Sequence, residues 1–272
     1  MRQGAAVLVV LSCSLLPGCS PKEAPKKLVL TGSSTIAPLA AELGKKFESL
    51  HPGVRVDVQS GGSGRGVADA RQGLSDIGLV SRALKDDEKD LTPFLLARDG
   101  ICIILHKDNP LKELSDEQVV SIYTGKITNW KDVGGKEAPI TVVNKAEGRS
   151  TLELFCHYYK LKNTDIQAHV VIGDNAQGIK TVAGNPDSIG YVSIGNAEFE
   201  GRQGTSIKLL PCKGVPASIE SVIQGKFPLA RELNLVTKRA PEGLVKEFLD
   251  WAQSDKVHDL IREQYFVPIT RQ

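Results

Sequence analysis

Three segments of the chain place small hydroxyl residues and glycine just ahead of an amphipathic stretch. They are TGSSTIAP at 31–38, SGGSGRGV at 60–67 and NKAEGRSTLEL at 144–154. Each follows a strand-like run, so its hydroxyls and free backbone N–H groups would lie at a helix N-terminus. Such an end carries about half a positive elementary charge and is suited to anions. Three of them directed at one point predict a site for a small anion.

Each segment alone is explained at least as well by helix capping and turn formation, for which Ser, Thr and Gly are the usual residues. The three together, with the cations Arg82, Lys145 and Arg149 nearby, favour binding. Glycine supports the same interpretation, because a missing Cβ lets a backbone N–H approach a ligand closely. We therefore expect Gly64 in the site.

Motifs for catalysis and metal binding do not fit the chain. The segment 61–66 is not GxSxG, because Arg65 stands where the second glycine belongs, and it matches neither GxGxxG nor a Walker loop. The five histidines are scattered, and no CxxC occurs. The sequence thus predicts no catalytic residue, no metal site and no cofactor.

The elements that must position these segments can be predicted from apolar spacing. We expect strands at 27–32, 54–60 and 75–81, a helix from Ile36 to about Leu50, a glycine-rich loop, and a short helix from Val67 to about Leu74. Ser115 with Gln118, and Asp174 with Gln177, predict the starts of two later helices. Strands alternating with helices predict an α/β class with parallel sheets. The helical blocks favour two lobes, joined by strand-like segments near 100 and 230.

The N-terminus has the pattern of an export signal. One charge, Arg2, precedes an apolar run that ends in LPGC at 16–19. The run is shorter than the roughly 20 residues that span a bilayer, and its ending resembles a lipobox, so we expect removal of 1–18 and acylation of Cys19. An ordinary secretory signal is the alternative. The polar residues after Cys19 are predicted to be a tether.

Composition and cysteines limit the remaining possibilities. The chain has 272 residues, 41% of them apolar, and a formal net charge of +2, which gives no electrostatic case for nucleic acid. Beyond Cys13 and Cys19, three cysteines remain: Cys102, Cys156 and Cys212. One exported disulfide is possible among them, but the sequence does not indicate which pair.

Several ordered motifs resemble the periplasmic phosphate-binding proteins of the phosphate ABC importer, in their shorter bacterial form. They are GSSTIAPL, SGGSGRG, DIGLVSR, IYTGKITNWKDVGG, DSIGYVSI and FPLARELNLVTK, spread over nearly the whole chain after the signal. The resemblance implies a two-lobed class II periplasmic binding protein fold that closes on its ligand about a hinge and docks on a membrane permease.

The resemblance also implies ligand-binding residues. From the first segment these are Ser34 or Thr35 and the N–H of Ile36, and from the second Ser63. Ser81, with Arg82 adjacent, takes the place where longer members have a carboxylate. The last contribution is the segment from Lys145 to Thr151, which includes Arg149 and Ser150.

That last segment departs from the family pattern Arg-x-x-Gly-Ser-Gly-Thr. Lys145 replaces the arginine, and Arg149 stands where a serine is usual. Lysine cannot give the bidentate grip of a guanidinium, which Arg149 could supply instead. Since Ser81 is no carboxylate, the acceptor for a phosphate proton must come from elsewhere. Glu147 is the candidate for this acceptor. The alternative interpretation is that Glu147 lies in the first turn of its helix and only complements the helix dipole.

The sequence therefore predicts an exported lipoprotein that captures phosphate for an ABC importer permease, acts as a monomer without enzymatic activity, and touches the membrane only through its lipid. Another oxyanion (sulfate, molybdate or tungstate) is the alternative ligand, and a surface-anchored phosphate-ester hydrolase the alternative class. The expected division is a signal peptide at 1–18, a tether at 19–27, a first lobe at 28–103, a second at 104–203, and a return to the first at 204–272.

Overall fold

The computed structural model describes residues 25–269. The predicted signal peptide, Cys19 and most of the tether lie outside the described residues. Strand β1 (Lys26–Gly32) begins two residues before the expected start of the first lobe, because Lys26 and Lys27 pair with Val54 and Arg55 of strand β2 (Val54–Ser60). Within the described range, no helix has the length and apolar character needed to cross a membrane.

The described strands form one sheet in the order β2-β1-β3-β9-β4-β7-β5-β6, to which β8 and β10 add by pairing with β4. Neighbours among β1, β2 and β3 are parallel, as are β5–β6 and β5–β7, whereas β9 and β4 run antiparallel to the strands beside them. The predicted α/β class is thus confirmed. The remaining strand bounds are β3 (Ile77–Val80), β4 (Thr92–His106), β5 (Thr141–Lys145), β6 (Val170–Ile172), β7 (Ser188–Ser193), β8 (Ile207–Leu209), β9 (Ala230–Thr237) and β10 (Val267–Pro268).

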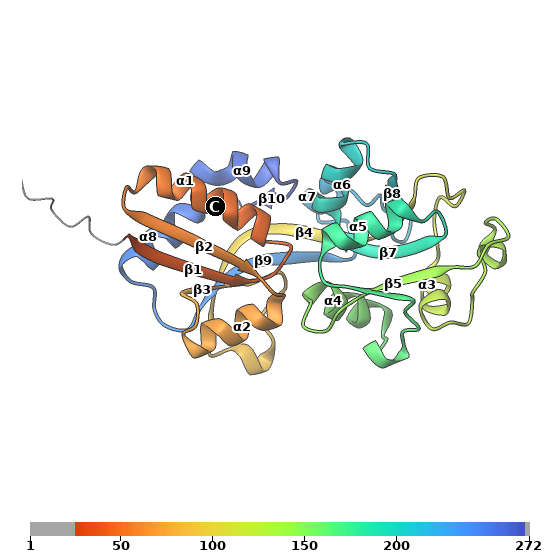
Figure 1. Ribbon diagram of the computed structural model, residues 1–272, viewed down its shortest axis with the longest axis horizontal. Helices are drawn as coiled ribbons and strands as arrows, with labels where there is room; N and C mark the ends of the chain where they lie inside the picture. The colour runs from red at the N-terminus through yellow and green to blue at the C-terminus, as the bar shows by residue number, and fades with distance from the viewer. Residues whose placement is uncertain (1–24, 270–272) are drawn as a thin grey trace, which may run out of the picture.

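Figure 1 shows the sheet drawn out into two lobes, with β4 and β9 running between them. In the first lobe α1 and α9 lie on one side of the strands and α2 on the other, and α3 to α7 surround the strands of the second. The helix bounds are α1 (Ala37–Leu50), α2 (Ser63–Gln72), α3 (Asp116–Tyr123), α4 (Ser150–Tyr159), α5 (Asn175–Gly184), α6 (Ile194–Arg202), α7 (Ile219–Ile223), α8 (Gly243–Ala252) and α9 (His258–Glu263).

Each lobe has its own apolar core. One large cluster combines side chains from 28–97 with side chains from 233–266, and another extends from Ile101 to Leu229. Apolar side chains between 207 and 229 pack in the second cluster, beyond the boundary expected at 204. We therefore propose that the chain returns to the first lobe through β9.

The helix starts predicted from capping patterns are confirmed. Ser115 Oγ accepts a hydrogen bond from the N–H of Gln118, and Asp174 accepts one from the N–H of Gln177. The expected loop at 61–66 is wrong, because α2 already begins at Ser63. Glycine lowers helix propensity, but a Cβ on Gly66 would come within 2.6 Å of Leu79 O and 2.9 Å of Thr31 O. Close packing on β1 and β3 thus outweighs the propensity.

Candidate functional site

Four buried serines, three of them from the predicted hydroxyl segments and the fourth Ser81, meet between the lobes and form what we call the serine cluster. Ser33 Oγ donates to Ser81 Oγ at 2.8 Å, and Ser63 Oγ lies 3.4 Å from the same atom. Ser150 Oγ, from the second lobe, lies 2.5 Å from Ser81 Oγ. Ser63 and Ser150 are the first residues of α2 and α4, so two helix N-termini end at this cluster.

The N-terminus of α1 reaches the same cluster through Ser33. Its hydroxyl accepts the N–H groups of Thr35 at 3.2 Å and Ile36 at 3.3 Å. Thr35 and Ile36 are buried, whereas Ser34 is half-buried and lines a cavity beside the cluster. The sequence indicated Ser34 and missed Ser33, because adjacent serines in a turn point in different directions that the pattern does not reveal.

Lys145 brings a buried cation to the site from the end of β5. Its side chain is almost fully enclosed, and Nζ donates to Asn175 Oδ1 at 3.0 Å. Burial, opposed by Asp174 and reinforced by Arg231 and Arg149, lowers the pKa of Lys145 to about 7. An anion placed here would restore the charge, since an opposite charge favours the ammonium form.

Arg149 also lies at the interface between the lobes. Its Nε is buried and has no hydrogen-bond partner in the structure. A Cβ on Gly62, at the start of α2, would lie 3.0 Å from Arg149 Cδ, so the side chain passes close to the first lobe. The unpaired Nε is a free donor, consistent with the predicted role of Arg149 toward an anion.

Glu147 does not contact the serine cluster. It is exposed, and its Oε1 accepts a hydrogen bond from Asn163 Nδ2 at 3.1 Å. This geometry gives no support to the predicted role of Glu147 as the acceptor of a phosphate proton.

Arg82 is engaged by carboxylates rather than by the cluster. Its NH1 and NH2 pair with Glu88 at 2.6 and 2.8 Å, and its Nε pairs with Glu153 Oε2 at 2.6 Å. Burial disfavours the charge, but the two carboxylates outweigh it and raise the pKa of Arg82. Because Glu153 belongs to α4, Arg82 joins the lobes instead of presenting free donors to the cleft.

Sequence reasoning missed a second buried ion pair. Arg231 of β9 donates to Asp99 Oδ2 of β4 from both Nε at 3.0 Å and NH2 at 2.7 Å. The signal in the sequence was one charged residue inside each of two strongly β-forming segments. Because a buried charge is rarely retained without a partner, the sequence could have predicted that Asp99 and Arg231 pair with each other.

The lobes touch directly beside the cluster. The N–H of Gly64 donates to Gly148 O at 3.1 Å, so the predicted Gly64 serves an interlobe contact. A cavity of about 350 Å³ adjoins this region, lined from the first lobe by Ser34 and Ser60 and from the second by Asp174 and Asn175. The described conformation is therefore a closed one, and the cavity is connected to the site through Asn175, which bonds to Thr35 and Lys145.

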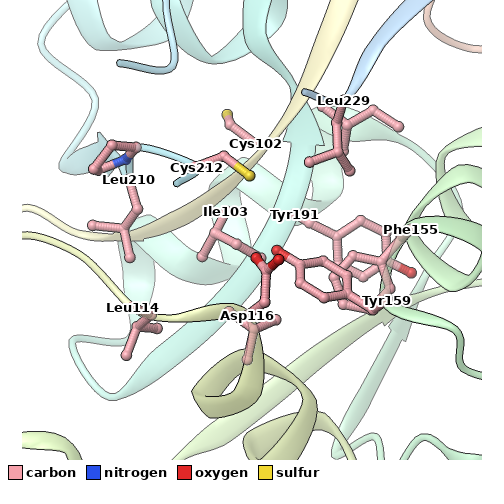
Figure 2. Close-up of a pocket in the computed structure, with 13 residues that line it drawn as sticks. Cys102, Ile103, Leu114, Asp116, Phe155, Tyr159, Tyr191, Leu210, Cys212 and Leu229 are labelled. Atoms are coloured by element: carbon pink, nitrogen blue, oxygen red, sulfur yellow. The ribbon is translucent and has the colours of Figure 1, made fainter. Parts of the chain in front are cut away.

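Figure 2 shows a different cavity, inside the second lobe. Its volume of about 10 Å³ holds one water molecule at most. Cys102 and Cys212 border it with thiols that form no disulfide, and burial raises the pKa of both. Cys156, the third cysteine of the described range, is also free. None of the serine-cluster residues lines this cavity, so it is separate from the anion site.

The arrangement offers hydroxyls, helix N-termini and buried cations at one point. Within residues 25–269, no group of three or more His, Cys, Asp or Glu side chains is placed to hold a metal ion. Hydrogen bonds to a charged partner are stronger than neutral ones, so such donors can replace the hydration of a small anion. Four hydroxyls close together suit an oxyanion with several oxygens.

Comparisons with known proteins agree with this geometry. A family model described as a PBP superfamily domain matches residues 20–256. The phosphate-binding protein PstS of Bacillus subtilis is 29% identical over 255 residues, which cover 92% of this chain and 83% of that protein. A phosphate ABC transporter substrate-binding protein from Clostridium perfringens, solved with bound phosphate, is 32% identical with a TM-score of 0.81, covering 90% of this chain and 100% of that one. An ABC-type phosphate transport receptor from Vibrio cholerae is 28% identical with a TM-score of 0.74, covering 90% and 100%.

Proposed function

Since the chain belongs to the PBP superfamily and, within it, to the PstS phosphate-binding proteins, we propose that it captures inorganic phosphate in its interlobe cleft for an ABC importer. The observation that carries this is the serine cluster, which joins the N-termini of α2 and α4 from opposite lobes. A ligand held there contacts both lobes, so binding is coupled to closure, and closure presents one defined shape to a permease.

The ligand chemistry favours phosphate over other oxyanions. Near neutral pH phosphate keeps at least one proton, and a dehydrated site must accept it. A serine hydroxyl can accept as well as donate, so the serine cluster can fill the place of the missing carboxylate. Sulfate has no proton to offer, so phosphate can form one hydrogen bond with such a lone pair that sulfate cannot form.

The remaining parts of the proposal concern location and chemistry. We propose export, anchoring through an acylated Cys19, and action as a monomer without enzymatic activity. The relatives named above are binding and transport proteins rather than enzymes. A hydrolase would need an activated nucleophile, and the serine hydroxyls described here are bonded to one another and to backbone N–H groups rather than to a histidine or carboxylate base.

Calorimetric titration of the tether-free protein with phosphate, sulfate and molybdate tests the proposed ligand. We expect phosphate to bind about tenfold or more tightly than sulfate. Equal affinity for phosphate and sulfate would overturn the phosphate assignment. Turnover of a chromogenic phosphate ester would instead support the hydrolase alternative.

Glu153 provides a second test, which concerns closure. It accepts from Arg82 at 2.6 Å and from Lys85 at 3.2 Å, both of the first lobe. Glu153→Gln removes a partly exposed interlobe ion pair of about 1 kcal/mol, so phosphate affinity should fall about fivefold. Small-angle scattering should show the half-point of contraction at a correspondingly higher phosphate concentration.

The matched control is Glu137→Gln, because Glu137 pairs at 2.6 Å with Lys131 of its own lobe at the surface. Its affinity should equal that of the wild type. If both variants bound phosphate equally well, the ion pairs of Glu153 would have no part in closure.

A further inference from the structure

The guanidinium of Arg231 contacts three separate parts of the molecule. Besides Asp99 it reaches Thr35 Oγ1, at 3.2 Å from NH2, and Thr151 Oγ1, at 3.1 Å from NH1. Thr35 precedes α1 in the first lobe, and Thr151 lies in the first turn of α4 in the second. The side chains of Arg231 and Asp99 are 1% and 0% exposed. One buried guanidinium thus connects the strands between the lobes to a hydroxyl from each lobe.

The hydrogen bonds of Thr35 fix the direction of its proton. A hydroxyl has one proton to donate and two lone pairs to accept with. Thr35 Oγ1 accepts from Arg231 NH2 and also from Asn175 Nδ2, each at 3.2 Å. Both lone pairs are therefore engaged, and the O–H must donate to something else.

Thr151 is held by a single bond, since its Oγ1 accepts from Arg231 NH1 and keeps one lone pair free. In the described part of the chain, neither threonine hydroxyl donates a hydrogen bond to protein. Both are buried beside the serine cluster, whose Ser150 is the residue preceding Thr151 and whose Ser33 accepts the N–H of Thr35. Two O–H groups without an acceptor thus lie next to the site proposed for the anion.

Asp99 keeps the guanidinium in this orientation. Its Oδ2 accepts hydrogen bonds from Nε and NH2 of Arg231, while its Oδ1 accepts the N–H of Gly195 at 3.2 Å. The carboxylate is thereby fixed from two sides. The remaining N–H groups of the guanidinium then point to Thr35, from NH2, and to Thr151, from NH1. Lysine at 231 would keep the charge but could not hold this fork of donors.

Resting on the proposed function, we propose that Arg231 is a positioning residue that directs the O–H groups of Thr35 and Thr151 toward the bound oxyanion, and that Thr35, with both lone pairs engaged, acts there only as a donor. The two hydroxyls then bind unprotonated oxygens of the anion, one from each lobe. The protonated oxygen is left to Ser150 of the serine cluster, whose hydroxyl has Ser81 Oγ as its one partner and keeps a lone pair free. Arg231 thus acts on the ligand through the threonines rather than by touching it.

The test is a mutant cycle read by calorimetry with inorganic phosphate. Arg231→Lys should weaken binding about tenfold or more in the wild-type background. In a protein that already carries both Thr35→Val and Thr151→Val, Arg231→Lys should lower the phosphate affinity less than about threefold, because no hydroxyl remains to be oriented. An equal factor in both backgrounds would show a general charge or folding effect and overturn the proposal.

Three single variants keep the test decisive if Arg231→Lys fails to fold. Thr35→Val and Thr151→Val should each weaken phosphate binding about tenfold or more, and Thr35→Ser should stay within about threefold of the wild type. Binding within about twofold for both valine variants would overturn the role of the hydroxyls, and with it that of Arg231. A wild-type protein that bound none of phosphate, sulfate and molybdate would overturn the proposed function itself.

Discussion

Replacing Gly62 by alanine is expected to weaken phosphate binding about 100-fold while both lobes remain folded. Gly62 lies at φ +98°, and a Cβ there would come within 2.6 Å of Gly148 O and 3.0 Å of Arg149 Cδ. Gly148 and Arg149 belong to the other lobe, so the collision occurs only when the lobes close. Forcing extra volume into a packed contact costs about 3 kcal/mol at the upper end of the usual range, which corresponds to this loss of affinity.

Gly73→Ala is the matched control. Gly73 also has a positive φ, +72°, but a Cβ there would meet nothing within 4 Å. Gly73→Ala thus reports the cost of alanine at a positive φ without a collision, whereas Gly62→Ala adds both the interlobe collision and the larger backbone strain of ψ 158° in place of 21°. Calorimetry gives the affinities, and scattering should show that Gly62→Ala contracts less at saturating phosphate. Affinities within about threefold of each other for the two variants would exclude a role for this contact in closure.

The ligand-free protein is expected to gain stability as the pH rises from 7 to 9, through Lys145. Its pKa is about 7 in the fold, against an ordinary value of 10.5. Between these values the unfolded chain binds one more proton than the folded protein, so the free energy of unfolding increases with pH. At about 1.4 kcal/mol per pH unit, the gain over this range is about 2 to 3 kcal/mol.

Denaturant unfolding of the wild type and Lys145→Met, with and without phosphate, measures this effect. The methionine variant carries no titrating group at 145, so its gain should be smaller by the amount given above. Saturating phosphate should also remove the gain in the wild type, because an anion beside Lys145 raises its pKa toward the ordinary value. An identical pH dependence in the wild type and the variant would show that Lys145 is not the group responsible.

Local sequence patterns were enough to identify three of the segments that meet at the serine cluster. Hydroxyl and glycine residues ahead of apolar spacing predicted α1 and α4, and capping residues predicted the starts of α3 and α5. These features depend on contacts within a few residues, which is why the chain itself specifies them. The α/β class follows in the same way from the alternation of predicted strands and helices along the chain.

The start of α2 could not be predicted in this way. Its glycines argue for a loop, since glycine lowers helix propensity. The helix forms because Gly66 packs against backbone oxygens of β1 and β3, where any Cβ would collide. That contact joins residues distant in the chain, and local propensity contains no information about it.

Which side chains face the cleft was decided by the tertiary structure alone. The sequence indicated Arg82, but Glu88 and Glu153 engage it, whereas Arg231 reaches both lobes. It also indicated Ser34, although Ser33 joins the serine cluster. A pattern shows that hydroxyls and cations are present in a segment. Which of them meet depends on strand pairing and lobe closure, because these bring residues near 33, 81, 150 and 231 within a few ångströms of one another.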